Sequence, residues 1–229
     1  MLNIIKKLYN ISENCIFPNF CYKCLNFIEE GYLCSQCLKN INFNIYLFCP
    51  KCYRRKPIGE KLIDACCSNI IKTLITFNDY NNKPIDKLII DGKFNGYWQI
   101  FNWFGNLISS YLNDLNILNF HLTYVPLSKK VERERGFNQT KILAKKIAKN
   151  LKLPLFEKIE KIKETEFQAK LDYQQRLKNI QNCFKAKDKP PKNLIIIDDI
   201  ITTGTTLFEL AKNLRESGSK NILALTICK

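Results

Sequence analysis

The chain has 229 residues, enough for one full domain plus a small module. Hydrophobic residues make up 46% of it and charged residues 25%, which is ordinary for a soluble globular protein. No apolar run reaches the roughly 20 residues that a membrane-spanning helix requires. The amphipathic stretch 1–9 lacks the long apolar core and the cleavage site of a signal peptide. We therefore expect a cytoplasmic protein without membrane insertion.

The formal net charge of +15 is unevenly distributed. Residues 125–192 contain 19 Lys and Arg against 8 Asp and Glu, a surplus of 11. Such a surplus suits a polyanionic partner, either the phosphates of a small molecule or a nucleic-acid backbone. The whole chain is rich in Lys, Asn and Ile, so a general drift in composition is the alternative explanation.

The first part of the chain, residues 15–68, is predicted to be a turn-rich module stapled by metal. Nine of the 11 cysteines lie before residue 68, and in a chain without an export signal paired cysteines indicate metal ligands before disulfides. Two-residue spacers let both thiolates face one tetrahedral zinc ion. The expected ligand sets are Cys21, Cys24, Cys34 and Cys37, followed by Cys49, Cys52, Cys66 and Cys67.

The contiguity of Cys66 and Cys67 leaves two outcomes open for the second set. Both thiols could ligate under some strain, or the second site is weakened or lost. Of the other cysteines, Cys15 is expected to be a spare thiol, and Cys183 and Cys228 small core residues. The run 54–56 (Arg-Arg-Lys), next to a tyrosine, fits either a nucleic-acid contact or a solvated basic turn.

Residues 70–229 are predicted to form an α/β domain, with a hood or linker over 70–120 and a core over 121–229. Hydrophobic periodicity predicts strands over 70–77, 122–125, 193–197 and 221–227, and helices over 97–112, 138–151 and 205–217. Residues 85–90 fit a helix or a strand. The charged stretch 158–192 is expected to be a mobile loop, with a small strand at its far end. Strand, helix and strand with short connections indicate a βαβ unit and a partly parallel sheet.

The most informative segment is 194–206, LIIIDDIITTGTT, where a buried strand precedes two carboxylates, a small-residue loop and a helix start. Amides at a helix start bind anions, and adjacent carboxylates can accept hydrogen bonds from two ribose hydroxyls. This chemistry favours a ribose 5-phosphate. Ordinary threonine helix caps would explain one or two of these residues, but not the whole set. The candidate ligand-binding residues are Asp198, Asp199, Thr202, Thr203, Gly204, Thr205 and Thr206.

This segment resembles the phosphoribosyl-diphosphate-binding motif of the type I phosphoribosyltransferases. Further stretches are similar to the ComF family of competence-associated proteins: 125–128 (VPLS), 133–139 (RERGFNQ), 165–184 with its Gln168 and Arg176, and 93–96 (KFNG). Together with the cysteine pairs, the resemblance covers nearly the whole chain. It implies a type I phosphoribosyltransferase-like fold, a mainly parallel sheet flanked by helices, behind a double zinc ribbon.

The resemblance also implies roles for single residues. A diphosphate would lie on the loop 125–129 with Mg²⁺ between its oxygens, and Arg133 and Arg135 would contact phosphate. The alternative is that both arginines lie on a solvated helix start. A hood over 158–179 would supply Lys163, Gln168 or Arg176. The candidate catalytic residues are Asp198, Asp199 and Arg176.

Three functions remain open at this point. The resemblance implies a protein that binds phosphoribosyl diphosphate and handles incoming DNA during natural transformation, with structural Zn²⁺, Mg²⁺ and a competence helicase as a partner. A single-stranded DNA-binding protein with a vestigial or sensing pocket is the second. A nucleotide-salvage phosphoribosyltransferase is the third. No residue stands out as a general base, and His121 is expected to be structural.

Overall fold

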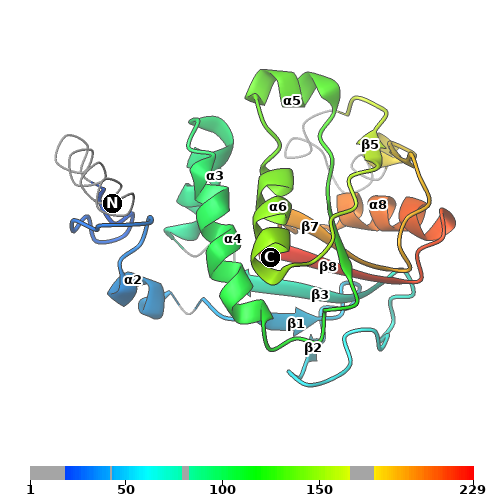
Figure 1. Cartoon of the computed structure of the whole chain (residues 1–229), viewed down its shortest axis with the longest axis horizontal. Coiled ribbons are helices and arrows are strands. Elements are labelled where there is room, and N and C mark those ends of the chain that lie inside the picture. Colours follow the sequence, from blue (N-terminus) through cyan, green and yellow to red (C-terminus); the bar gives the residue numbers. More distant parts are fainter. Residues whose placement is uncertain (1–18, 42, 79–82, 166–177) are drawn as a thin grey trace, which may run out of the picture.

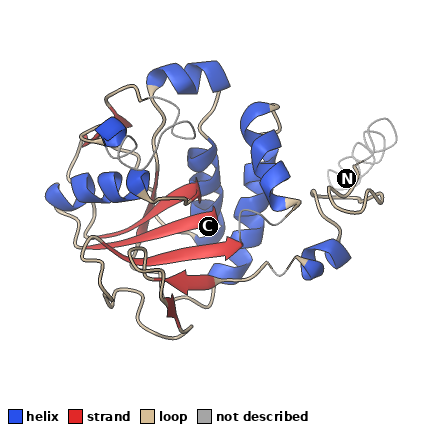
Figure 2. Cartoon of the chain, turned by 180° about the vertical axis from the view of Figure 1, so that it is seen from behind, coloured by secondary structure: helices blue, strands red, loops and turns tan. Residues whose placement is uncertain are grey.

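The computed structural model describes residues 19–41, 43–78, 83–165 and 178–229. They form an α/β fold in which helices cover both faces of a six-stranded sheet (Figures 1 and 2). The sheet has the order β2-β1-β3-β8-β7-β4. Its strands are β1 (Tyr46–Phe48), β2 (Arg55–Lys56), β3 (Ile71–Asn78), β4 (His121–Tyr124), β7 (Asn193–Ile200) and β8 (Asn221–Cys228). Pairing is parallel from β3 through β8 and β7 to β4, which confirms the predicted fold class.

The two faces of the sheet follow from the alternation of side chains along each strand. On β7, Leu194 and Ile196 belong to the core beneath α8 (Thr205–Glu216). Ile195 and Ile197 belong to the opposite core, beneath α4 (Gln99–Leu112) and α6 (Gln139–Leu151). Both faces are apolar, as a sheet buried on both sides requires. This explains why the predicted strand over 193–197 is one continuous apolar run.

The cysteine-rich segment joins this sheet through a hairpin that the sequence patterns do not predict. β1 pairs antiparallel with both β2 and β3, with Tyr46 opposite Thr76. Cys49 and Cys52 lie in the turn between β1 and β2, and α2 (Ser35–Asn40) precedes the hairpin. The predicted segments 15–68 and 70–229 thus each contribute strands to one sheet.

The remaining elements refine the sequence-based predictions. Residues 85–90 are helical, within α3 (Ile85–Phe94), and a short helix α5 (Lys129–Arg135) follows β4. The prediction of a loop from residue 158 is wrong at its start, because β5 (Ile159–Lys161) pairs with β6 (Phe184–Ala186). Ile159 and Phe184 are buried under α8, which is the apolar signal that the surrounding charge obscures. No helix within the described ranges is long and apolar enough to cross a bilayer.

Candidate functional site

The two carboxylates lie at the carboxyl end of β7, where open α/β sheets bind ligands. Alternation along the strand turns Asp199 toward the side of α3 and α6, and Asp198 to the opposite side. Asp199 is 4% exposed, and its backbone N–H donates to a carboxylate oxygen of Asp198 at 2.9 Å. The charge of Asp199 disfavours ionisation of Asp198, so the two carboxylates cannot both be ionised in a buried site without a compensating cation.

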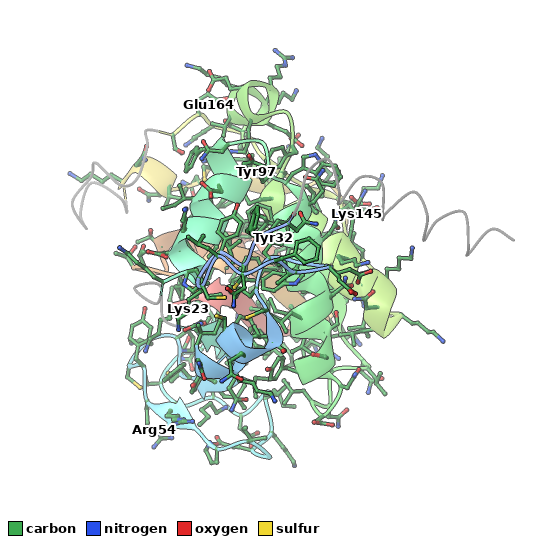
Figure 3. All side chains as sticks on the ribbon, turned by 90° about the vertical axis from the view of Figure 1, so that its left-hand side faces the viewer. Lys23, Tyr32, Arg54, Tyr97, Lys145 and Glu164 are labelled. Atoms are coloured by element: carbon green, nitrogen blue, oxygen red, sulfur yellow. The ribbon has the colours of Figure 1, made fainter. Side chains whose placement is uncertain are left out.

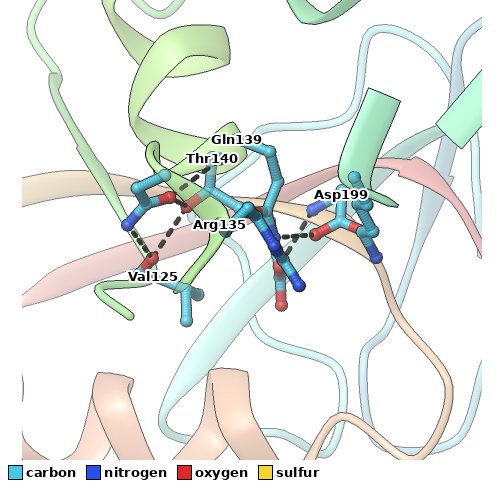
Figure 4. Close-up of polar contacts among 8 residues, drawn as sticks. Val125, Arg135, Gln139, Thr140 and Asp199 are labelled. Atoms are coloured by element: carbon cyan, nitrogen blue, oxygen red, sulfur yellow. Dashed lines mark hydrogen bonds and ion pairs between the residues drawn. The ribbon is translucent and has the colours of Figure 1, made fainter. Parts of the chain in front are cut away.

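Lys93, near the C-terminal end of α3, supplies this cation by an ion pair with Asp199. Gln139, the first residue of α6, donates its amide N–H to Asp199 Oδ1 at 3.2 Å and accepts from Arg135 at 2.6 Å (Figure 4). Burial opposes ionisation of Asp199, but Lys93 outweighs burial and lowers its pKa. Burial and the charge of Asp199 raise the pKa of Asp198 well above its usual value. One carboxylate is therefore held ionised, while its neighbour titrates at higher pH.

The loop that follows β7 turns directly into α8. Gly204 is the residue before the helix and has a left-handed φ of 74°, and a Cβ there would lie 3.3 Å from Ile201 and Phe208. The left-handed φ therefore favours glycine, and a Cβ would also sit tightly against these two side chains. As the N-cap residue of α8, Gly204 has no side chain that could occupy the helix start, and N–H groups at a helix start favour a bound anion. The hydroxyls of Thr203 and Thr205 lie 3.2 Å apart beside them.

A second loop, between β4 and α5, is held in place by the start of α6. The Val125 carbonyl accepts from Thr140 Oγ1 at 2.7 Å and from Asn138 Nδ2 at 3.2 Å. The side-chain oxygen of Asn138 also accepts from the backbone amides of Thr140 and Lys141, which caps α6 as its residue type predicts. Asn138 thus fixes this loop and the helix that carries Gln139.

A third segment, at the end of β5, lies against the same loop. The hydroxyl of Ser128, which caps α5, donates to Glu164 at 2.5 Å and holds the pKa of that carboxyl below its usual value. Lys161 donates to Thr165 Oγ1 at 2.5 Å, and burial lowers the pKa of Lys161. The segment at the end of β5 therefore places a partly desolvated cation, Lys161, beside the loop between β4 and α5.

These elements enclose one cavity of about 520 Å³. It is lined by the two aspartates, by all five residues of the loop 202–206, by Arg135 and Lys161, and by apolar residues that include Phe94. The Arg135 guanidinium lies over the Phe94 ring, 5.2 Å from its centroid. Arg133 is exposed on α5 and is not among the lining residues.

Three residues predicted for the hood have different outcomes. Lys163 donates to the carbonyl of Gln181 at 3.4 Å and does not line the cavity. Gln168 and Arg176 lie outside the described residues, so their predicted roles stay predictions.

Both cysteine sets converge into clusters, each with its four Sγ atoms within 4.8 Å of one another. A tetrahedral zinc ion with Zn–S bonds of about 2.3 Å separates its sulfurs by about 3.8 Å. The Cys24–Cys34 separation is 3.8 Å in the first cluster; Cys52–Cys66 is 3.7 Å and Cys49–Cys67 is 3.5 Å in the second. Contiguous cysteines therefore do not keep the second cluster from gathering four ligands. Both clusters could hold a metal ion, and their all-sulfur chemistry suits zinc.

Backbone amides favour the thiolate form that a metal requires. Although burial raises the pKa of Cys21, N–H groups of neighbouring residues outweigh it and lower that pKa to about 6. Cys49 occupies the equivalent place in the second cluster, and its pKa is also lowered to about 6, against the effect of burial. Two thiols are thus ready to ionise near neutral pH. Cys183 and Cys228 are fully buried, as predicted for core residues, and Cys15 lies outside the described residues.

The basic run 54–56 divides between surface and core. Lys56 is 3% exposed, and its ammonium donates to the Asp64 carbonyl at 2.8 Å and to Thr73 Oγ1 at 3.0 Å. The interpretation of all three residues as an exposed basic surface is therefore wrong for Lys56, because the β2 alternation turns it inward. Arg54 and Arg55 remain exposed, and Arg54 lies at the opposite end of the molecule from Glu164 in Figure 3.

Comparison with known proteins identifies the family. Competence protein ComFC of Bacillus subtilis (strain 168) is 30% identical over 208 residues, which cover 86% of this chain and 78% of that protein. The chain belongs to the ComF family. Competence protein F of Haemophilus influenzae is 26% identical to this ComF-family chain over 212 residues, 88% of the chain and 86% of the relative. DNA utilization protein YhgH of Escherichia coli (strain K12) is 25% identical over 228 residues, which cover 93% of this chain and 97% of that protein. No protein-family model matches the chain.

The geometry of this ComF-family chain explains two of the motifs. In the run 133–139, Arg135 and Gln139 form a hydrogen-bonded relay to Asp199, and in the run 93–96, Lys93 forms the ion pair with the same carboxylate. Lys93 and Gln139 belong to the site but were not predicted as site residues. The available signal was that both residues lie in motifs shared with the family. The neighbouring sequence does not indicate which side chain of a motif turns into the cavity.

Proposed function

We propose that this ComF-family protein binds phosphoribosyl diphosphate, with Mg²⁺, in the cavity at the carboxyl end of β7. The observation that supports the proposal best is the junction of two carboxylates, a threonine–glycine loop and a helix start in one cavity. Each component matches one part of the ligand. Amides of the loop 202–206 suit the 5-phosphate, and the pair Asp198 and Asp199 suits the two ribose hydroxyls.

Two cationic side chains would contact the phosphate groups of the proposed ligand. Arg135 and Lys161 both line the cavity, and both are partly desolvated. Desolvated cations attract phosphate more strongly than exposed ones. Mg²⁺, which prefers oxygen ligands, would lie between the diphosphate oxygens and reduce their negative charge. The residues Val125 to Ser128 would supply further backbone contacts.

The proposed function is ligand binding. Transfer of the phosphoribosyl group to an acceptor would be a second activity of the same site. Transfer would displace diphosphate at the anomeric carbon, and the cations near the diphosphate would favour its departure. The described lining residues include no histidine and no glutamate, and the two aspartates are assigned to ribose. A release assay for diphosphate, run over candidate acceptors, separates the two activities.

The cellular role is proposed from the relatives. Their printed names describe competence proteins and DNA utilization proteins. We propose that this chain likewise acts in the handling of DNA during natural transformation, in the cytoplasm. The ligand in the cavity would then be a cofactor, a substrate or a signal for that process.

Calorimetry with phosphoribosyl diphosphate and Mg²⁺ tests the proposal. The wild type should bind, and the Asp198→Asn/Asp199→Asn variant should lose binding while it keeps its zinc. Arg135→Ala should weaken binding more than Arg133→Ala, because only the former side chain lines the cavity. Absence of binding by a folded, zinc-loaded wild type would contradict the proposal.

Single-stranded DNA binding is a second candidate, supported by the net charge of +15 and by the exposed Arg54 and Arg55. Fluorescence anisotropy with a labelled oligonucleotide should show binding that weakens steeply with salt. Arg54→Ala/Arg55→Ala should reduce that salt dependence, and Lys56→Ala should not. Binding that is independent of salt would argue against a backbone contact.

A further inference from the structure

The second cysteine cluster touches the proposed phosphate loop through one side chain. Tyr53 follows Cys52 directly, and its hydroxyl donates to the backbone carbonyl of Thr202 at 3.3 Å. The two residues are 149 positions apart in the sequence. Thr202 is the first residue of the loop 202–206 and lines the cavity. A metal-ligand turn and a ligand-binding loop are therefore in direct contact.

Backbone hydrogen bonds stabilise the turn that carries Tyr53. Tyr53 N–H donates to the Cys49 carbonyl, and Cys49 N–H donates to the Arg54 carbonyl, both at 2.9 Å. Tyr53 has a left-handed φ of 57°, which is uncommon for a residue with a side chain and persists only where the surroundings fix it. Cys49 and Cys52 of the second cluster belong to this turn, and a metal ion bound to the cluster would restrain it.

The last residue of the chain supports the same arrangement. The Lys229 ammonium lies 4.1 Å from the centroid of the Phe48 ring and 5.4 Å from that of Tyr53. The residue before Lys229 accepts a hydrogen bond at its carbonyl from Ile201 N–H, at 3.0 Å. The tyrosine ring and Ile201, the residue before the loop, thus contact two adjacent residues, Lys229 and Cys228.

The contact has a defined effect on the loop. In a trans peptide the C=O and N–H groups point in opposite directions within one plane. A hydrogen bond that draws the Thr202 carbonyl toward Tyr53 therefore directs the Thr203 N–H away from Tyr53. Amides fixed in advance bind an anion better than amides that must first be ordered.

We propose that Tyr53 is a positioning residue, and that a zinc ion in the second cluster orders the loop 202–206 through it. The second cluster then acts directly on the loop 202–206, whereas the first cluster packs beside α3 and α4. The benefit to ligand affinity rests on the proposed function. The ordering of the loop is independent of it.

Tyr53→Phe tests the proposal because it keeps the ring and removes the donor. We expect affinity for phosphoribosyl diphosphate to fall about fivefold, the effect of one neutral hydrogen bond. We also expect faster hydrogen exchange of the loop amides in the ligand-free protein, measured by mass spectrometry. Tyr97→Phe, another exposed tyrosine outside the cavity lining, is the matched control and should change neither quantity.

Metal-site variants test the second half of the proposal. Cys66→Ser should remove the second metal, weaken binding and speed loop exchange, and adding Tyr53→Phe to it should have little further effect. Cys24→Ser should remove the first metal and leave loop exchange as in the wild type. Metal content is measured for every variant, together with thermal unfolding.

The outcomes separate the two proposals. A wild type that fails to bind phosphoribosyl diphosphate would refute the proposed function, and loop exchange would still decide the role of Tyr53. Unchanged loop exchange in Tyr53→Phe would overturn the inference, even where Cys66→Ser proves unable to fold. Equal acceleration by Cys24→Ser and Cys66→Ser would overturn the role of the second metal, since it would reflect general destabilisation.

Discussion

Replacing Lys93 by methionine should destabilise the protein by leaving Asp199 buried without its cation. The side chains of Lys93 and Asp199 are 18% and 5% exposed, and removal of one partner of a buried ion pair costs about 3–5 kcal/mol. Gln139 continues to donate to Asp199, so we expect the lower end, about 3 kcal/mol of unfolding free energy.

The pH dependence gives this prediction a second signature. In the wild type the pKa of Asp199 is lowered, so the stability from the ion pair is present above the unfolded value of about 3.9 and lost as pH falls. In Lys93→Met, only the hydrogen bonds from Gln139 and Asp198 still oppose burial, so that pKa rises. The difference between variant and wild type should therefore be largest at neutral pH and shrink as acid protonates Asp199.

Urea unfolding at fixed zinc concentration measures both effects. Lys145→Met is the control, because Lys145 pairs with Glu157 at 3.5 Å where the side chains are 54% and 40% exposed; such pairs contribute less than about 1 kcal/mol. Lys93→Met/Asp199→Asn should be more stable than Lys93→Met alone. A loss below about 1 kcal/mol that is independent of pH would refute the assignment of Lys93 as the compensating cation.

Three further predictions follow from the geometry. Gly204→Ala should cost about 1–2 kcal/mol in urea unfolding and weaken phosphoribosyl diphosphate binding in calorimetry, since its φ is 74°; unchanged values would contradict the required left-handed turn. The purified chain should contain two zinc ions by elemental analysis, and Cys24→Ser and Cys66→Ser should each retain one; a single ion in the wild type would show that only one cluster binds. Lys56→Ala should lower stability by about 2 kcal/mol, because it leaves buried acceptors without a donor, while an unchanged midpoint would indicate that Lys56 is solvated.

The parts of the fold that the sequence predicted are those encoded by local patterns. The helix 138–151 begins one residue late, because Asn138 is its cap, as its residue type indicates. The strand before Asp198 and the helix after Gly204 lie where continuous apolar residues, small residues and helical periodicity placed them. The candidate loop was accessible to sequence reasoning because all its members are contiguous.

The parts that the sequence did not predict depend on contacts between distant residues. Nothing near Lys93 indicates that it pairs with a carboxylate 106 positions later. The burial of Lys56 depends on acceptors from the turn near Asp64 and from β3. Short strands such as β1 and β5 give too few residues for a period to be read, and they are recognised only by their partners.

The pairing of β1 with β3 has a consequence for how the chain can be shortened. A truncation that begins at residue 70 would remove β1 and leave β3 as the outer strand of the sheet. Seven of the eight residues of β3 are buried, so the exposed strand would offer unpaired backbone groups beside apolar side chains. Such an edge promotes pairing with other molecules and aggregation. The cysteine hairpin thus caps the sheet of the domain that follows it, and the two parts are expected to be soluble only together.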